Sequence, residues 1–243
     1  MPHFYVLPQN AANGSFIMEN ELAHYVAAVR RFKVGDEINL FDGLGKSFKG
    51  KITNIEKNRI DGKILSSSYQ KPAWTANLYT AIPKGERFEW LIEKCAELGL
   101  SKIVPINTAR SVLTEISENK IERFKRISIA ASSQCGRADI MEICRPLNFQ
   151  DACKKAVSDK TINILPWESE SGQSISQALS GKPLKSGIAA FIGPEGGFEN
   201  AEIDFAKTLG FYTVSLGKNI LRVETAALAT AVLVTNTLSE QNL

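Results

Sequence analysis

The sequence predicts an α/β protein in which a small β barrel precedes a domain with a mainly parallel sheet. Up to about residue 69, short apolar stretches are separated by Asp42-Gly43 and Asp61-Gly62, pairs that are typical of β-hairpin turns. From residue 73 onward, strand patterns and helix patterns alternate along the chain. The strands of this second part are apolar on both faces, which favours a parallel sheet covered by helices.

Each element of the expected barrel follows from a local pattern. Residues 3–7 predict a strand that Pro8 ends, and Asn20 is expected to cap a short helix. Residues 37–41 predict a second strand, and an alternating run carries Phe48, Ile52 and Ile55. The serine-rich stretch that ends in Lys71-Pro72 indicates a linker. We therefore expect one domain over residues 1–70 and another over residues 73–243.

The second domain is expected to alternate strands with helices. Helical spacing of apolar residues predicts one helix that ends at Gly99, a second that ends near Gly136, and a third that Asn148 caps. The last helix, around residues 226–234, is apolar nearly all round, which indicates burial inside the domain or against another subunit. The expected strands lie at residues 77–82, 103–106, 161–165, 188–192 and 212–216.

Composition places the chain among ordinary globular proteins. Its 29 Lys and Arg against 26 Asp and Glu leave a net charge of +3, which tolerates a polyanionic partner without requiring one. The four cysteines form no CxxC pair, so we expect buried free thiols and no metal site. The first ten residues lack a signal-peptide pattern, and residues 226–234 are too short to span a membrane. We expect a soluble, cytoplasmic protein.

Two segments with glycine after an expected strand are the candidate ligand site. Residues 193–197 read Gly-Pro-Glu-Gly-Gly, and residues 216–222 contain Gly217 and an apolar Ile220-Leu221 pair with Arg222 beside it. Neither segment has the spacing of a phosphate loop or of the dinucleotide fingerprint. Glycine permits close approach of backbone, so a ligand here would be held by N–H and C=O groups. The alternative is that residues 193–197 form only a tight turn before a helix.

These two segments also carry a family resemblance. GPEGGF at residues 193–198, followed by LGKNILRVETAA at residues 216–227, resembles the RsmE family. Further matching stretches lie at residues 24–30, 34–36, 82–85, 93–99, 110–112 and 134–137. The resemblance implies methylation of N3 of a uridine in small-subunit (16S) ribosomal RNA by S-adenosylmethionine. It also implies a PUA-like barrel, a SPOUT domain with a deep trefoil knot at about residues 161–243, and a homodimer whose active site forms at the subunit contact.

The resemblance assigns three strand-end loops to the cofactor, with main-chain groups and apolar side chains gripping the adenine. The implied cofactor-binding residues are Leu165, Pro166, Gly193, Glu195, Gly196, Gly197, Leu216, Gly217, Ile220, Leu221, Arg222 and Thr225. No metal ion is implied.

Catalysis would need alignment of the two reactants, loss of the N3 proton and stabilisation of charge on the ring. Arg222 is the first candidate for stabilising that charge, because a guanidinium stays protonated. The alternative is that Arg222 forms an ion pair with Glu224. Glu195 or Glu224 is a candidate general base. The competing interpretation of Glu224 is a favourable charge at the positive end of the last helix.

The RNA contacts are the least specific part of the interpretation. The basic residues expected near phosphates are Arg30, Arg31, Lys84, Arg110 and Arg137, although each could equally be a solvated surface charge. The chain departs from the family at His3, where arginine is usual nearby, at Ser133 and at Met141. Two alternatives remain open: a SPOUT enzyme that acts on transfer RNA, and an RNA-binding assembly factor without methyltransferase activity.

Overall fold

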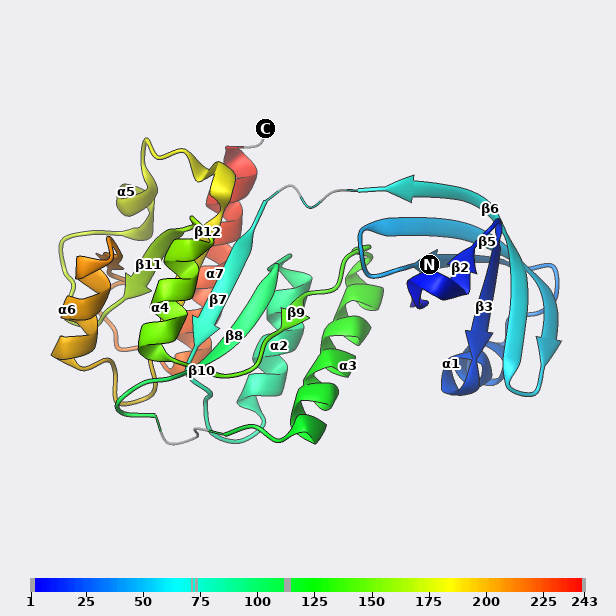
Figure 1. Ribbon diagram of the computed structural model, residues 1–243, viewed down its shortest axis with the longest axis horizontal. Coiled ribbons are helices and arrows are strands. Elements are labelled where there is room, and N and C mark those ends of the chain that lie inside the picture. Colours follow the sequence, from blue (N-terminus) through cyan, green and yellow to red (C-terminus); the bar gives the residue numbers. More distant parts are fainter. Residues whose placement is uncertain (1–2, 71, 73, 112–114, 242–243) are drawn as a thin grey trace. The chain divides into compact units, whose positions relative to one another are not determined.

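The protein divides into two compact units. The computed structural model describes residues 3–70, 72, 74–111 and 115–241. Unit 1 comprises Met1–Pro72 and Ile129–Ile140, and unit 2 comprises Ala73–Ser128 and Met141–Leu243 (Figure 1). Unit 1 therefore includes the end of a helix from the middle of the chain. No local sequence pattern indicates that grouping.

Unit 1 is built on one six-stranded sheet whose strands lie in the order β1-β4-β5-β6-β3-β2. The side chains of Phe16, Met18, Leu40 and Ile60 are almost fully buried and form the centre of its core. A short helix, α1 (Asn20–His24), continues into a π-helical turn over Tyr25–Val29. The strands are β1 (His3–Tyr5), β2 (Ala11–Ala12), β3 (Ser15–Glu19), β4 (Glu37–Phe41), β5 (Lys46–Glu56) and β6 (Arg59–Tyr69).

Three local expectations in unit 1 are wrong. Asp61-Gly62 is no turn, because both residues lie inside β6 and the hairpin turn falls at Lys57 and Asn58. Residues 66–68 are no linker, because they pair with β5. Asn20 does not cap α1: it has a positive φ of 55°, and the N-cap position belongs to Glu19. For residues 61–62 and 66–68, pairing with other strands overrides the local preference.

Gly62 lies inside a strand because the ring of Phe16 occupies the space beside it. A Cβ atom at Gly62 would lie 2.1 Å from Cε1 of Phe16 and 2.6 Å from the backbone oxygen of Lys51. Glycine in a strand interior often marks such a close approach. The pair that resembles a turn signal is therefore a packing requirement of the unit 1 core.

We expect Gly62→Ala to destabilise unit 1. Overpacking a filled core costs about 1–3 kcal/mol, since the Phe16 ring and the β5 backbone would both have to shift. Differential scanning calorimetry of the full chain measures the effect, with the exposed neighbour Lys63→Ala as the control. A Gly62→Ala transition indistinguishable from that of Lys63→Ala would contradict the packing argument.

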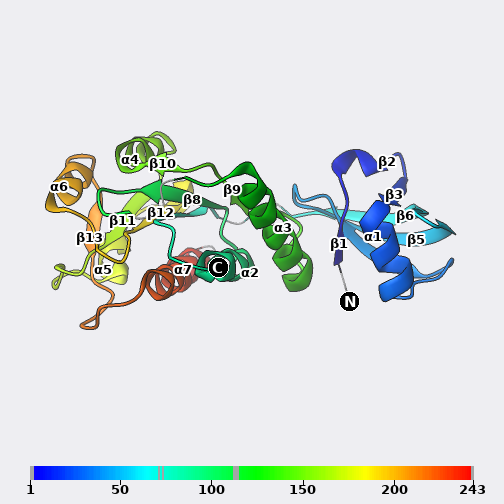
Figure 2. The same cartoon turned by 90° about the horizontal axis from the view of Figure 1, so that it is seen from below.

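Unit 2 confirms the predicted α/β architecture with a parallel sheet. Its strands lie in the order β10-β8-β7-β12-β11-β13, β9 also pairs with β8, and every recorded pairing is parallel. Figure 2 shows α4 and α6 on one face of the sheet and α2, α5 and α7 on the other. The strands are β7 (Ala76–Thr80), β8 (Lys102–Asn107), β9 (Glu142–Ile143), β10 (Leu147–Asn148), β11 (Ile162–Pro166), β12 (Ile188–Ile192) and β13 (Tyr212–Val214). The helices are α2 (Arg87–Glu97), α4 (Phe149–Ser158), α5 (Ile175–Leu179), α6 (Asn200–Thr208) and α7 (Val223–Glu240), together with the first part of α3 (Glu118–Cys135), whose end belongs to unit 1.

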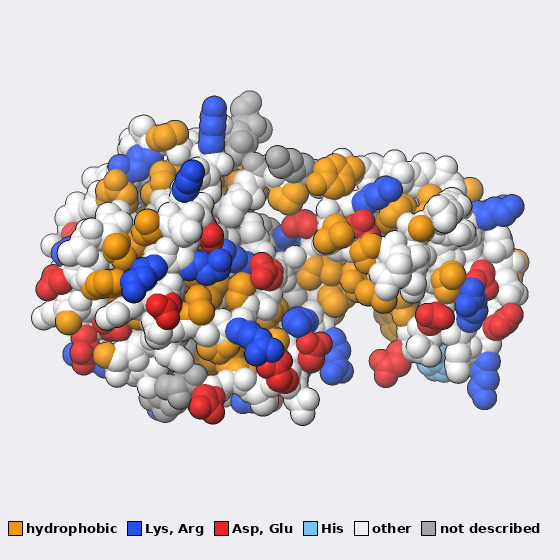
Figure 3. Space-filling model, viewed as in Figure 1, with side chains coloured by type: hydrophobic (Ala, Val, Ile, Leu, Met, Phe, Trp, Pro, Cys, Tyr) orange, Lys and Arg blue, Asp and Glu red, His pale blue; other side chains and the backbone are white. Residues whose placement is uncertain are grey.

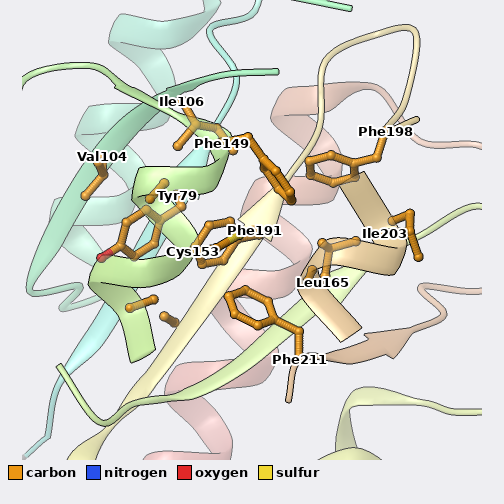
Figure 4. Close-up of a cluster of buried hydrophobic side chains, with 14 residues drawn as sticks. Tyr79, Val104, Ile106, Phe149, Cys153, Leu165, Phe191, Phe198, Ile203 and Phe211 are labelled. Carbon is orange, nitrogen blue, oxygen red and sulfur yellow. The ribbon is translucent and has the colours of Figure 1, made fainter. Parts of the chain in front are cut away.

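An aromatic cluster fills one face of this sheet and reaches the end of β12 (Figure 4). The ring of Phe191 stacks on Tyr79 with centroids 4.4 Å apart, and Phe211 meets it edge-on at 4.9 Å. Phe149 packs against both Phe191 and Phe198. Phe198 comes from the segment that follows β12 and is buried. The cluster therefore fixes the position of a loop as well as the sheet.

Helix α7 buries one face and leaves another exposed. Val223, Ala227, Ala231 and Val234 are buried, and the helix packs against α2, β7 and β12. Val232 and Leu233 are 45% and 43% exposed. The sequence predicts burial all round this helix, but within the chain only one of its faces is buried.

All four cysteines are free thiols, but not all are buried. Cys95 and Cys153 are buried, Cys144 is half-buried and Cys135 is exposed. The expectation of burial is therefore wrong for Cys135, which is the last residue of α3 and is exposed to solvent. Burial raises the pKa of the Cys153 thiol to about 12, so this group stays protonated at neutral pH.

Candidate functional site

Three loops meet at one edge of the unit 2 sheet and enclose a pocket. We name them the β11 loop (residues 167–173), the β12 loop (residues 193–199) and the β13 loop (residues 215–222). β11 pairs in parallel with β12 and with β13, so the carboxyl ends of the three strands lie side by side. The pocket has a volume of about 240 Å³. Its lining is Pro166, Trp167, Glu168, Ile192, Gly193, Pro194, Glu195, Gly196, Gly197, Phe198, Leu216, Gly217, Lys218, Asn219, Ile220, Leu221, Val223 and Ala226.

Most residues assigned to the cofactor from the sequence line this pocket. Leu165, Arg222 and Thr225 do not. Leu165 is buried in the core cluster, while Arg222 and Thr225 are exposed around the start of α7. Alternation along β11 explains the first case, because neighbouring strand residues point to opposite sides. The remaining assigned residues are brought together: Pro166, Gly193, Glu195, Gly196, Gly197, Leu216, Gly217, Ile220 and Leu221.

The β12 loop has a backbone that needs glycine. Gly197 has φ of +69°, and its N–H donates to the oxygen of Pro194 at 2.9 Å, which closes a turn. A Cβ atom on Gly197 would lie 2.5 Å from Oε1 of Glu168, so the β11 loop approaches closely here. Phe198 then anchors the end of the turn in the aromatic core. The loop is held at both ends and exposes its backbone to the pocket between them.

The β11 loop contributes residues that sequence reasoning missed. Trp167 and Glu168 both line the pocket, and the N–H of Trp167 donates to the oxygen of Val214 at 3.0 Å. Glu170 accepts hydrogen bonds from the N–H of Gly172 and from Thr213 Oγ1. The bond from Gly172 is the main reason why the pKa of Glu170 lies below its ordinary value. The signal for Trp167 and Glu168 was their place directly after a strand-ending proline.

The β13 loop and the start of α7 form the opposite wall. Ile220 lines the pocket, yet its side chain is 90% exposed. Gly217 has φ of +110°, which favours glycine at this bend. Val223 and Ala226, one helical turn apart, present one face of α7 to the pocket. Ala226 is another lining residue that the sequence did not single out.

The two catalytic candidates do not pair with each other. Nε of Arg87 lies 3.6 Å from Oε1 of Glu224, whose side chain is only 14% exposed. The second carboxylate oxygen of Glu224 is buried without a hydrogen-bond partner among the described residues. Arg222 is the N-cap residue of α7, and within the described part of the chain its side chain forms neither a hydrogen bond nor an ion pair. The alternative interpretation, in which Arg222 forms an ion pair with Glu224, is therefore wrong.

The basic residues expected near RNA lie in different settings. Lys84 donates its backbone N–H to Oε1 of Glu195 at 3.4 Å, and Arg110 donates to the backbone oxygen of Gly196 at 2.8 Å. Arg30 and Arg31 are exposed residues of unit 1. Arg137 is 12% exposed and pairs with Asp139 at 2.5 Å. Figure 3 shows basic and acidic side chains interspersed on the face in view, without a field of one sign.

The pocket offers backbone groups, apolar side chains and few charges. This suits a ligand that is recognised by shape and by main-chain hydrogen bonds. Among the residues described, no three His, Cys, Asp or Glu side chains are grouped to hold a metal ion. Nor does the described chain contain a helix with the length and apolarity that crossing a membrane would need.

Comparison with known proteins relates this arrangement to RNA methyltransferases. An RNA methyltransferase domain matches residues 70–235, and an RNA methyltransferase PUA domain matches residues 19–65. A relative from Synechocystis, ribosomal RNA small subunit methyltransferase E, is 30% identical over 91% of this chain and 73% of its own length.

Two solved structures with similar folds contain S-adenosylmethionine. Ribosomal RNA small subunit methyltransferase E from Neisseria gonorrhoeae, bound to S-adenosylmethionine, is 28% identical with a TM-score of 0.85, over 98% of both chains. A methyltransferase from Legionella pneumophila with the same cofactor bound is 29% identical with a TM-score of 0.78, over 97% of both chains.

Proposed function

This chain belongs to the RNA methyltransferase family that includes ribosomal RNA small subunit methyltransferase E, and we propose that it methylates N3 of a uridine in small-subunit (16S) ribosomal RNA. The methyl donor is S-adenosylmethionine, as in the two similar structures that contain it. The observation that carries the proposal is the backbone-lined pocket between the β11, β12 and β13 loops. An RNA substrate of this kind implies an activity in the cytoplasm.

The residues of the pocket fit this cofactor. Gly197, with its φ of +69°, permits the turn by which the backbone of residues 193–197 faces the pocket. Leu216 and Leu221 provide apolar surface for an adenine ring, while main-chain N–H and C=O groups would bind its edge. When bound, S-adenosylmethionine supplies an electrophilic methyl group. The loops of this chain hold the donor still, which contributes to the rate through alignment.

Arg222 is proposed to stabilise negative charge on the uracil ring as the N3 proton leaves. Its exposed side chain has no partner within the described structure, so the guanidinium is available to a substrate beside the pocket. An oriented charge of this kind acts where the transition state develops charge. N3 lies on the pairing edge of uracil, so the target base must be unpaired or extruded.

Glu195 and Glu224 differ in how well their positions suit a general base. Glu195 lines the pocket and is exposed. Glu224 remains a candidate, but its neighbours Val223 and Ala226 face the pocket while its own carboxylate meets Arg87 at the start of α2. A position in the first turn of α7 favours a negative charge there. We therefore assign Glu224 to stabilising the start of α7 and favour Glu195 as the base.

The domain assignment is part of the same proposal. Residues 1–70 would form the PUA-like RNA-binding domain and residues 73–243 the SPOUT domain. The family matches at residues 19–65 and 70–235 support these limits. The three pocket loops and α7 all lie between residues 161 and 243, the part proposed to contain the trefoil knot.

The reaction is tested with the purified protein and small ribosomal subunits that lack the modification. Incubation with S-adenosylmethionine is expected to yield 3-methyluridine in the small-subunit RNA, which mass spectrometry of nucleosides identifies. Transfer RNA incubated in the same way is expected to stay unmodified. Methylation of a different atom, or of transfer RNA alone, would overturn the proposed substrate.

We also propose a homodimer that forms through α7. Val232 and Leu233 are exposed, and Leu228 and Ala229 are half-buried one turn earlier on the same side of the helix. Ile220, 90% exposed beside the pocket, is a further apolar side chain without cover. An exposed apolar helix face next to a binding site is typical of a subunit interface. A contact there would bring the partner subunit to the rim of the pocket.

Leu233→Asp is therefore expected to give a monomer. A carboxylate buried at the subunit contact without a partner would oppose association. Light scattering after size exclusion should show the 26.7 kDa mass of one chain for the variant and about twice that mass for the wild type. Val157→Asp on α4, also an exposed apolar position at 41%, is the matched control and should stay dimeric. A variant with the mass of the wild type would exclude this interface.

A further inference from the structure

The segment after β8 contacts the β12 loop from a fourth strand end. Residues 108–111, which we name the β8 loop, form a compact turn in which Ser111 Oγ accepts from the N–H of Thr108 at 2.9 Å. The N–H of Ser111 donates to the oxygen of Thr108 at 3.1 Å. This turn presents Arg110 and the backbone of Ala109 to the residues around the β12 loop.

Arg110 contacts the middle of the β12 loop in two ways. Its Nη1 donates to the backbone oxygen of Gly196 at 2.8 Å, and its Nε lies 3.6 Å from Oε1 of Glu199. The side chain also packs on the loop, because a Cβ atom at Gly196 would lie 3.3 Å from Cδ of Arg110. A single side chain therefore contacts both the glycine-rich part of the loop and Glu199, the N-cap residue of α6.

A second contact fastens the β8 loop to the same region. The N–H of Ala109 donates to Oε1 of Glu202 at 3.0 Å. The other oxygen of Glu202 accepts from the N–H of Glu199 at 2.9 Å, within the capping box of α6. The turn that carries Arg110 is thus fixed to the helix that the β12 loop enters. This arrangement orients the guanidinium toward Gly196.

We infer that Arg110 is a positioning residue that holds the β12 loop in the conformation that binds S-adenosylmethionine. This inference rests on the proposed function, and it replaces the phosphate contact that the sequence predicts for Arg110. By bonding the oxygen of Gly196, Arg110 sets the orientation of the peptide between Gly196 and Gly197. Both glycines line the pocket, so this peptide is part of the surface that meets the cofactor.

The test compares cofactor and RNA affinity in the full chain. Arg110→Ala is expected to raise the Kd for S-adenosylmethionine by about tenfold in calorimetry, the size of effect that loss of one charge-assisted hydrogen bond produces. The KM for the cofactor should rise likewise, while kcat at saturating cofactor stays near the wild-type value. RNA affinity without cofactor, and its dependence on salt, should not change.

Two further variants complete the experiment. Arg110→Lys keeps a donor near Gly196 and should recover part of the affinity, which also keeps the test valid if the alanine variant does not fold. Arg123→Ala removes an exposed arginine that does not line the pocket and whose Nη2 lies 2.7 Å from Oε2 of Glu89. This variant should bind the cofactor normally.

The outcomes separate the competing roles. An unchanged cofactor Kd together with a smaller salt dependence of RNA binding would overturn the inference and make Arg110 a phosphate contact. An unchanged cofactor Kd with unchanged RNA binding would overturn it as well. If the wild-type protein itself bound no S-adenosylmethionine, the proposed function would fail, and the inference with it.

Discussion

Arg222→Ala is expected to lower kcat by about 100- to 1000-fold, the range found when an oriented charge-stabilising group is removed from an active site. The Kd for S-adenosylmethionine should change by less than about twofold, because Arg222 does not line the pocket. Single-turnover methylation of small ribosomal subunits measures the rate, and calorimetry measures the affinity. We therefore expect a large fall in kcat with a nearly unchanged Kd for S-adenosylmethionine.

The physical reason is the position of Arg222 at the junction of the β13 loop and α7. The backbone there is fixed, because the oxygen of Arg222 accepts the first helical hydrogen bond from Ala226 at 2.8 Å. The side chain is exposed and unpaired within the described part of the chain, so its charge is available to a bound base.

Two control variants define what would contradict the assignment. Arg145→Ala removes an arginine that is 76% exposed and should be without effect. Arg222→Lys keeps the charge but loses the planar fork, so only part of the rate should return. If Arg222→Ala lost cofactor affinity and rate by the same factor, Arg222 would be a binding residue only.

Gly197→Val is expected to weaken cofactor binding by about 5- to 30-fold, because a left-handed backbone costs a residue with a Cβ atom about 1–2 kcal/mol. The β12 loop would relieve that cost by leaving its φ of +69°, and the peptide that faces the pocket would turn away. The new side chain would also meet the carboxylate of Glu168, only 2.5 Å from the Cβ position. Calorimetry with S-adenosylmethionine measures the loss.

Gly210→Val is the matched control for this variant. Gly210 has a similar φ of +81° after α6, but it does not line the pocket and has open space around its Cβ position. Both variants place a Cβ atom on a left-handed backbone and should lose thermal stability, whereas only Gly197→Val should lose cofactor affinity. Equal cofactor affinities for the two variants would show that the β12 loop conformation is not needed for binding.

Local patterns were reliable where one segment carries its own signal. The predicted strand at residues 188–192 has the bounds of β12, and Asn148 caps α4 by accepting from the N–H of Asp151 at 2.8 Å. Both features depend on a few adjacent residues: an apolar run in one case and a side chain that bonds the next turn in the other. Both features appear in the structure as predicted because no contact with a distant segment requires a different local conformation.

Local sequence patterns gave wrong predictions where a residue's structure depends on contacts with residues distant in the sequence. Asp61-Gly62 has the composition of a turn, but the Phe16 ring requires glycine inside a strand at that point. Cys135 has the apolar character of a core residue, yet it lies exposed at the end of α3. Glu224 meets Arg87, a residue far earlier in the chain, and not its near neighbour Arg222.

The sequence by itself determined the α/β class of the second part, the three strand-end loops of the candidate site and the family to which the chain belongs. These depend on hydrophobic periodicity and on short motifs that can be read in place. Only the tertiary structure decided that Trp167, Glu168 and Ala226 complete the pocket, and that Arg110 bonds Gly196. Those contacts join residues far apart along the chain, and the parallel strand order brings them to one sheet edge.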